Sequence, residues 1–379
     1  MTGGIPEKYK HMSKRIIVLI VLCAGFSACN DFLENIDPNE ISHQTFWKSE
    51  AEATMGLAGC YDALQDEYLY KPSPNGSGPF NFEFMTDNGF FTVYYDWMQG
   101  AEIARGDHNA SSYVLLGFWT ASYNAISRCN EVIHRVSEMP DGSIGEAAAS
   151  RIIAEAKVIR ALLYNQLTTL YRDVPMIMAP QTIAESQNTP KSDKATIVSA
   201  IIADLESAAE VLPPTVDKGS ELGRATRGAA LALLARVCLY NGQYEKAAQA
   251  AQAVIGSALY RLHPSYADLF TFEGGTSDEI VFSVRFKGTG LSEGGYLSLN
   301  YGYPPEWMVP FRNLADAYYG TDGKPIGESE VYDPADDSTR DPRLAANITT
   351  PNSYWEWTQS QWAWWFSNSP SGLFYRKFQ

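Results

Sequence analysis

The feature that most constrains this chain is the spacing of its apolar side chains. Between residues 118 and 136, one face is formed by Trp119, Tyr123, Ile126, Asn130 and Ile133. Steps of three and four residues keep side chains on one face of an α-helix. Asn130 falls on this apolar face, where a buried amide needs a hydrogen-bond partner. We therefore expect Asn130 to make an interhelical hydrogen bond, in preference to binding a ligand.

The same spacing predicts further helices in the first 260 residues. Residues 146–171 show the same three- and four-residue spacing of apolar side chains and contain no Gly or Pro, and Pro175 follows them. Residues 194–212 show it as well, and Pro213 and Pro214 follow them. Proline ends a helix because it lacks a backbone donor. An earlier amphipathic helix is expected over residues 45–68. These segments predict a mostly α-helical protein.

Residues 224–255 predict a helical hairpin, because two helical patterns meet at a short turn. Gly242 in the turn, Tyr244 after it and Ala247 at the expected helix crossing resemble a tetratricopeptide repeat. Leucine replaces the usual tryptophan of that motif, and Cys238 replaces a tyrosine. Eight alanines between residues 229 and 251 would let the helices approach closely.

After Tyr260 the sequence changes from helical to loop-forming. Residues 279–286 are β-rich and predict a strand, whereas residues 288–302 are rich in glycine. One helix is expected within residues 304–320, and residues 333–343 are turn-rich. The fold class predicted for the chain is mostly α, with tetratricopeptide-like hairpins and a loop-rich, minor-β ligand face.

The N-terminus resembles an export signal. Two basic residues precede an apolar run over residues 16–28, which is shorter than the roughly 20 residues needed to span a bilayer. The small residues before Cys29 resemble a bacterial lipobox, so we expect cleavage before Cys29 and acylation of its thiol. The alternative is an ordinary signal peptide cut near Ala28. Residues 29–44 are polar and acidic and predict a tether.

The charge of the chain excludes some partners. With 29 basic and 44 acidic residues the net charge is −15, and the cleaved chain would carry −18. Such a surface repels phosphate backbones, so no nucleic-acid partner is expected. Apart from Cys29, the cleaved chain holds Cys60, Cys129 and Cys238, each in an apolar helical context that favours a buried thiol. We expect no metal and no nucleophile there.

Two predicted loops combine aromatic side chains with Asp or Asn. Aromatic faces pack against pyranose rings, and the polar groups bond to sugar hydroxyls. The predicted glycan-binding residues are Asp87, Asn88, Tyr94, Tyr95 and Trp97 in the first loop, and Tyr301, Tyr303 and Trp307 in the second. A third cluster has five tryptophans within residues 355–365. The alternative for each cluster is a small core beneath a loop, which is favoured for the third.

Catalysis has less support from the sequence. Paired carboxylates can hydrolyse glycosides, and Glu83, Asp87, Asp96 and Glu306 are available, but chance pairs are expected in so acidic a chain. There is no His-Glu-x-x-His or Cys-x-x-Cys motif. His134, within a helix, is expected to be a capping or surface residue. A surface-anchored helical-repeat scaffold that binds a protein or peptide is a further alternative, but it leaves the aromatic loops without a role.

Several motifs together resemble the SusD/RagB family of outer-membrane nutrient-binding lipoproteins of Bacteroidetes. In chain order they are Phe46-Trp47, residues 119–133, residues 155–161 leading to Asp173-Val174-Pro175, residues 223–226, residues 266–270 before the predicted strand, residues 322–325 and residues 341–344. Two positions depart from the family pattern. Arg172 stands where the family has glycine, and Lys157 stands where arginine is common.

The resemblance implies a surface protein that captures oligosaccharides and delivers them to a SusC-like TonB-dependent outer-membrane transporter. It implies binding without catalysis and without a cofactor. The expected domains are a lipoprotein signal over residues 1–28, the acidic tether over 29–44, a helical part over 45–260 and a loop-rich part over 261–379. The family also implies further helices after these residues, so we expect a truncated reading frame.

Overall fold

The computed structural model describes residues 46–71, 79–91, 101–286, 308–352, 371 and 373–375. The chain divides into two compact units, Met1–Lys48 and Ser49–Gln379. In the first unit the described residues are 46–48, where the rings of Phe46 and Trp47 meet edge to face at 5.0 Å. The elements below belong to the second unit. The predicted acylation site, Cys29, lies outside the described residues.

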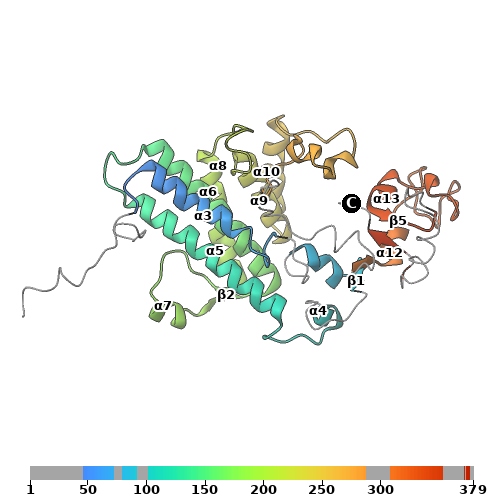
Figure 1. The fold of residues 1–379 in the computed structure, drawn as a ribbon, viewed down its shortest axis with the longest axis horizontal. Helices are drawn as coiled ribbons and strands as arrows, with labels where there is room; N and C mark the ends of the chain where they lie inside the picture. The colour runs from blue at the N-terminus through green and yellow to red at the C-terminus, as the bar shows by residue number, and fades with distance from the viewer. Residues whose placement is uncertain are drawn as a thin grey trace, which may run out of the picture. The chain divides into compact units, whose positions relative to one another are not determined.

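Six long helices form the helical part of the described chain (Figure 1). They are α3 (Glu50–Ala63), α5 (Tyr113–Ser137), α6 (Glu146–Leu170), α8 (Lys194–Val211), α9 (Arg227–Tyr240) and α10 (Tyr244–Gly256). Helix α6 packs against α5 and α8, α9 packs against α8 and α10, and α3 packs against α5 and α6. Sequence neighbours are thus neighbours in space, as in arrays of helical hairpins. The predicted mostly α fold is confirmed.

Local hydrogen bonds set the helix ends. Ser49 Oγ accepts a first-turn N–H at 3.4 Å, and α3 begins and ends inside its predicted span. Between α9 and α10 the N–H of Gln243 donates to the carbonyl of Cys238 at 2.9 Å. Gly242 in that turn has a φ of 74°, a conformation that favours glycine. The hairpin predicted over residues 224–255 is confirmed.

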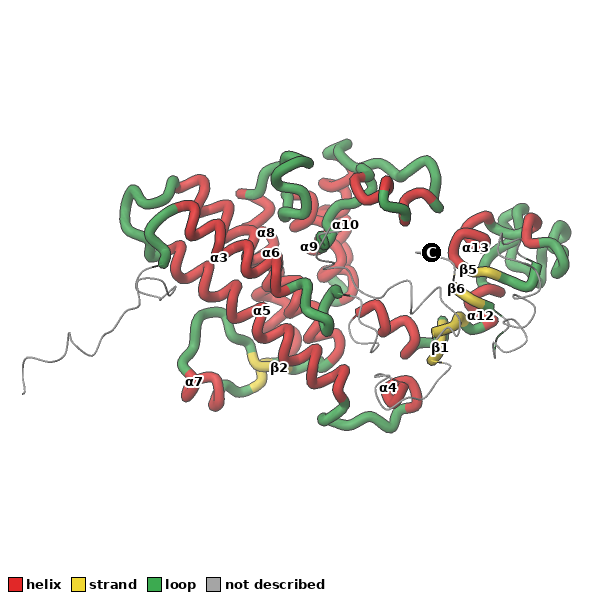
Figure 2. The backbone as a smooth tube through the Cα atoms, in the orientation of Figure 1, coloured by secondary structure: helices red, strands yellow, loops and turns green. Residues whose placement is uncertain are grey.

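The remaining elements are short. Three antiparallel pairs join β1 (Gly89–Phe91) to β4 (Met308–Pro310), β2 (Val174–Pro175) to β3 (Lys191–Ser192), and β5 (Ile348–Thr349) to β6 (Phe374–Tyr375). The short helices are α4 (Ala101–Arg105), α7 (Ile183–Asn188), α12 (Arg312–Asp316), α13 (Pro342–Asn347) and the 3₁₀ helices η1 (Pro79–Met85), η2 (Asp268–Phe270), η3 (Glu273–Thr276) and η4 (Asp337–Thr339). Loops connect most elements after α10 (Figure 2). The loop-rich, minor-β character predicted for this part is confirmed.

The strand predicted over residues 279–286 is wrong. The structure assigns no strand to these residues. A strand requires a neighbouring backbone, and no backbone hydrogen bond joins residues 281–286 to another described segment. Near the end of residues 279–286, the carbonyl of Arg285 accepts a hydrogen bond from a side chain, Gln65 Nε2, at 2.6 Å.

A buried guanidinium joins three helices of the core. Arg160 on α6 donates to Asp204 Oδ2 on α8 at 2.7 Å and to Asn130 Oδ1 on α5 at 2.6 Å. It also donates to the carbonyl of Met178 at 3.0 Å, and Asn130 Nδ2 donates to the carbonyl of Ile177 at 2.9 Å. Burial raises the pKa of Asp204, and the guanidinium opposes that rise. The interhelical role predicted for Asn130 is confirmed.

The cysteine thiols are buried and His134 is at the surface, as predicted from the sequence. Cys60, Cys129 and Cys238 are buried and free. Burial raises the pKa of the Cys129 and Cys238 thiols, so both stay protonated near neutral pH. The side chain of His134 is 42% exposed, and its Nε2 lies 3.2 Å from Glu138 Oε2.

Replacing Asp204 with alanine leaves the Arg160 charge buried without its carboxylate. Breaking a buried pair in this way costs about 3–5 kcal/mol, so urea titrations of Asp204→Ala should show that loss in the free energy of unfolding. The matched control is Glu206→Ala on the same helix. Its pair with Lys246 is 40% and 46% exposed and contributes less than about 1 kcal/mol. Equal losses in the two variants would contradict a structural role for the buried pair.

Candidate functional site

Residues 86–88 form the turn between η1 and β1 and include two predicted glycan-binding residues, Asp87 and Asn88. Thr86 Oγ1 donates to the carbonyl of Glu83 at 2.7 Å and accepts the N–H of Asn88 at 3.1 Å. Asn88 Nδ2 donates to Glu83 Oε1 at 2.7 Å. Asp87 is exposed, and its carboxylate accepts no hydrogen bond from any described residue. The turn is therefore held by its own side chains and presents one carboxylate to solvent.

Three groups from far along the chain bond to the backbone of this turn. The N–H of Phe311 donates to the carbonyl of Asn88 at 2.9 Å, and the hydroxyl of Tyr375 donates to the same carbonyl at 3.3 Å. Asn313 Nδ2 donates to the carbonyl of Asp87 at 2.7 Å. The position of Asp87 is thus set by residues of α12 and β6.

Gly89 is required for the close packing beside the turn. A Cβ at this position would lie 2.7 Å from the hydroxyl of Tyr375 and 2.8 Å from Cδ1 of Phe84, which is closer than real Cβ contacts. Phe84 is fully buried, and its ring meets that of Tyr375 edge to face at 5.6 Å. Phe90 stacks on Phe311 at 4.6 Å. These aromatic contacts fix where β1 begins.

The strand pair β1–β4 joins the two chain segments that are next in sequence to the predicted aromatic loops. Phe91 faces Met308 in an antiparallel register. The chain after Phe91 and the chain before Met308 therefore leave the pair at the same end. Asp87 precedes Gly89 and therefore lies beyond the opposite end of the pair. The residues Tyr94, Tyr95, Trp97, Tyr301, Tyr303 and Trp307, and the third cluster at 355–365, lie outside the described residues.

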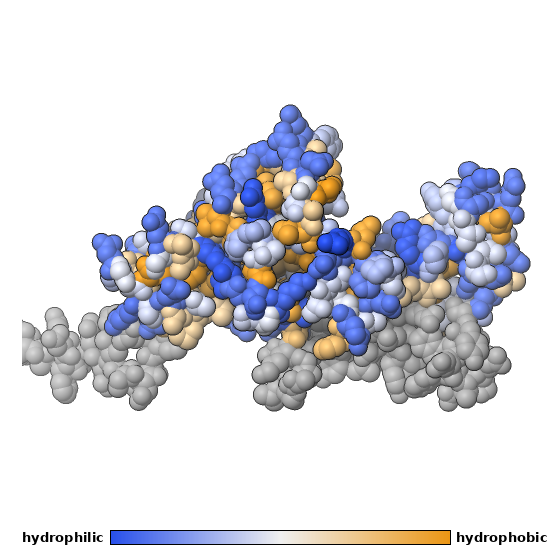
Figure 3. Space-filling model, turned by 90° about the horizontal axis from the view of Figure 1, so that it is seen from above, coloured by the Kyte–Doolittle hydropathy of each residue, from blue (hydrophilic) through white to orange (hydrophobic). Residues whose placement is uncertain are grey.

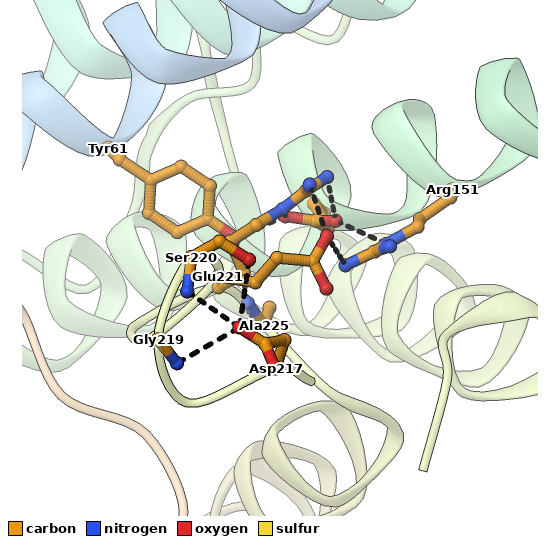
Figure 4. Close-up of polar contacts among 9 residues, drawn as sticks. Tyr61, Arg151, Asp217, Gly219, Ser220, Glu221 and Ala225 are labelled. Atoms are coloured by element: carbon orange, nitrogen blue, oxygen red, sulfur yellow. Dashed lines mark hydrogen bonds and ion pairs between the residues drawn. The ribbon is translucent and has the colours of Figure 1, made fainter. Parts of the chain in front are cut away.

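A buried ion network ties α3 and α6 to the loop before α9 (Figure 4). Glu155 is fully buried, and its Oε1 accepts from Arg224 Nη2 at 2.6 Å and from Arg151 Nε at 3.1 Å. Its Oε2 accepts from the hydroxyl of Tyr61 at 2.7 Å. Burial and the adjacent carboxylate raise the pKa of Tyr61. Asp217 holds the same loop by accepting two backbone N–H groups, at 2.7 and 3.0 Å. Both oxygens of Glu155 are thus occupied by groups from α3, α6 and the loop before α9, which it holds together.

Three hollows of about 290, 430 and 460 Å³ border residues 280–286. Their walls come from α3, α6, α9, the loop before α9 and residues after α10. None of the predicted glycan-binding residues lines them. Sequence reasoning missed these hollows, because their walls come from separate segments that only the fold brings together.

The described part of the chain holds no group of three His, Cys, Asp or Glu residues placed to bind a metal ion. In the same part, no helix combines the length and apolarity needed to cross a bilayer.

A family model described as starch-binding and associating with the outer membrane matches residues 31–239. The chain belongs to this SusD-like family. A SusD-like protein of Formosa agariphila, P25, is 24% identical over 282 residues, which are 72% of this chain and 52% of that protein. The chain spans about half the length of the curated relatives it matches.

Solved structures confirm the fold. A SusD-like carbohydrate-binding protein of Bacteroides fragilis superposes with a TM-score of 0.73 at 24% identity, over 88% of this chain and 68% of that one. A laminarin-binding SusD-like protein superposes with a TM-score of 0.67 at 22% identity, over 87% and 72%. The tetratricopeptide-like helical array is therefore that of SusD-like proteins.

The substitution Gly89→Ala should loosen the turn that carries Asp87. Its Cβ would push Phe84 and Tyr375 apart and weaken the bond from the N–H of Phe311. Hydrogen exchange at that amide should become at least about tenfold faster, or about 1.4 kcal/mol of local stability. The matched control is Gly59→Ala in α3, where no atom lies within 4 Å of the added Cβ. Alanine there should stabilise the helix by about 0.5–1 kcal/mol. Unchanged exchange at Phe311 would contradict the role of Gly89.

Proposed function

We propose that this protein is a cell-surface glycan-binding lipoprotein that captures oligosaccharides and delivers them to a SusC-like TonB-dependent outer-membrane transporter. The observation that carries the proposal is the exposed carboxylate of Asp87, in a turn that Asn313 holds through a backbone carbonyl. The two predicted aromatic loops follow Phe91 and precede Met308 in the sequence. Membership of a family described as starch-binding and associated with the outer membrane supports it.

The proposed binding residues have the chemistry that sugars need. Trp97 with Tyr94 or Tyr95 would stack against a pyranose ring, and Tyr301, Tyr303 and Trp307 would extend the platform from the second loop. Asp87 would accept a hydrogen bond from a sugar hydroxyl, and the Asn88 amide would add a polar contact beside it. Each such contact contributes about 1 kcal/mol, so affinity should lie between micromolar and millimolar, about 4–8 kcal/mol.

The protein is proposed to bind its glycan without turning it over. The buried carboxylate of Glu155 is bound by two arginines and a tyrosine, which leaves it without a role in acid–base chemistry. Residues 290–294 match the pattern Gly-x-Ser-x-Gly. A serine nucleophile of that class needs a strand, a sharp turn and a helix around it, whereas this run lies in a glycine-rich segment without helical spacing.

The proposed attachment to the membrane is through Cys29. In this organisation residues 1–28 are a cleaved signal, residues 29–44 are the tether, and the helical and loop-rich parts follow. Two or more lipid chains give stable anchoring, whereas one chain gives marginal anchoring.

Trp97→Ala tests the proposed platform. Loss of a stacking tryptophan should weaken binding of the best oligosaccharide by roughly tenfold or more in calorimetric titrations, with little change in the melting temperature. No reducing ends should appear during the titration. The matched control is Trp119→Ala in α5, whose ring contacts Tyr123 and Tyr171 at 4.9 and 5.2 Å. That control should lower the free energy of unfolding by about 2–4 kcal/mol. Unchanged binding with a collapsed melting temperature in Trp97→Ala would assign Trp97 to a core instead.

Cys29→Ala tests the anchor. The variant should leave the outer-membrane fraction and should not label with a fatty-acid probe, because it lacks the thiol that would be acylated. The control is Cys23→Ala, within the predicted signal, which should still label and fractionate with the membrane. Labelled, membrane-bound Cys29→Ala protein would refute the assignment.

A further inference from the structure

Two of the buried thiols are neighbours where α3 packs against α5. Cys60 on α3 and Cys129 on α5 are both 0% exposed, and the two helices contact each other. The thiol of Cys60 is a hydrogen-bonding neighbour of the thiol of Cys129. Neither side chain belongs to the candidate site or to the ion pairs of the helical part.

A second set of contacts fixes the register of the two helices at the same place. Arg128 Nη1 donates to the carbonyl of Gly59 at 2.9 Å and pairs with Asp62 Oδ2 at 2.9 Å. Gly59 and Arg128, which are 69 positions apart in the sequence, directly precede the two cysteines. Helices α3 and α5 are thus joined one residue away from the thiols by contacts that do not involve sulfur.

The third described cysteine has a different environment. Cys238 lies on α9, which packs against α8 and α10, and the charged groups that act on its thiol are Lys246 and Glu206. Among the described cysteines, Cys60 and Cys129 are therefore the pair placed to react with each other.

The compartment decides whether two adjacent thiols stay reduced. Exported proteins meet disulfide donors, whereas the thiols of cytosolic proteins are kept reduced. Resting on the export that is part of the proposed function, we propose that Cys60 and Cys129 form a disulfide that links α3 to α5. Thiols that are already neighbours need little backbone movement to reach the geometry of a disulfide.

The oxidant is a disulfide donor, either a dithiol oxidoreductase in its oxidised form or a small disulfide. The thiolate of one cysteine attacks the donor disulfide, which gives a mixed disulfide and releases one donor sulfur. The thiolate of the other cysteine then attacks the bonded cysteine sulfur, so the new S–S bond forms and the second donor sulfur leaves. The two cysteines lose two protons and two electrons, and the donor is reduced to two thiols.

The bond has to form while the chain folds. The face of the molecule in Figure 3 mixes hydrophilic residues with smaller apolar patches, whereas both cysteines have no exposed surface. Burial also raises the pKa of the Cys129 thiol, and exchange needs a thiolate. A donor can therefore reach the two thiols before α3 packs on α5, and not afterwards.

The bond would attach the first long helix of the described chain to the rest of the helical array. Without it, α3 is held by packing and by hydrogen bonds such as the one from the Tyr61 hydroxyl to Glu155. A link between positions 69 apart restricts the unfolded chain, so it favours the folded state.

The first experiment maps the bond in the full chain isolated from the membrane fraction. Thiols are trapped with N-ethylmaleimide during lysis and unfolding, and tryptic peptides are compared by mass spectrometry before and after reduction. We expect a linked pair of peptides, one with Cys60 and one with Cys129, that is lighter than its reduced components by two hydrogen atoms and that separates on reduction. Cys238 should carry N-ethylmaleimide in the unreduced sample.

Two results would overturn the proposal. They are N-ethylmaleimide on both Cys60 and Cys129 in unreduced, membrane-bound protein, and a linked peptide that contains Cys238. If the chain stays in the cytoplasmic fraction, the export part of the proposed function fails, and the reduced full chain is then refolded with oxidised glutathione. The linked peptides in that sample would support the proposal, and their absence would overturn it.

Alanine variants separate a disulfide from packing alone. The melting temperature of the unchanged protein should fall by about 5 °C or more in a phosphine reductant. That of Cys60→Ala or Cys129→Ala should be the same with and without reductant, because neither variant can form the bond. The matched control is Cys238→Ala, a third buried thiol, which should keep the full response. Equal responses in Cys60→Ala and the unchanged protein, or no response in the unchanged protein, would refute the link.

Discussion

The buried guanidinium of Arg160 is the constraint on which the helical part depends. A charge removed from water must be paired and hydrogen-bonded, and here its partners come from α5, α8 and the carbonyl of Met178. These bonds fix how α5, α6 and α8 meet around the guanidinium. Hydrophobic packing alone would allow them to slide, because many apolar side chains can exchange neighbours at small cost.

The site depends on a different kind of interaction. Isolated two-stranded pairs are marginal in water, and β1 and β4 have three residues each. Their stability comes from the aromatic rings beside them, where Phe90 stacks on Phe311 and Phe84 packs on Tyr375. The helical part thus supplies rigidity, while a small aromatic core holds the β1–β4 pair and the turn that carries Asp87.

Sequence reasoning predicted the helices because their signal is local. Apolar periodicity located α5, α6, α8 and the α9–α10 hairpin, and it identified Asn130 as a buried amide with a partner. The strand expected over residues 279–286 was wrong, since β-propensity describes a run of residues whereas a strand also needs a neighbour.

The candidate site could be predicted only in part. Composition indicated Asp87 and Asn88, but their contacts with Asn313 and Phe311 join positions more than 200 residues apart, and no local pattern encodes such a pairing. Gly89 offered one usable signal, because glycine after Asp-Asn often marks a turn. The residues that surround it came only from the fold.

These contacts between distant positions of the sequence determine the order in which the parts of the structure can form. Helices α5, α6, α8, α9 and α10 pack against sequence neighbours, so they can form while the rest of the chain is still being made. The turn at residues 86–88 must wait, since Tyr375, which donates to the carbonyl of Asn88, is 287 positions away. An early segment of the chain therefore reaches its working conformation last, and a chain stopped before α12 and β6 would build the helical array but leave the turn that carries Asp87 without its distant hydrogen bonds.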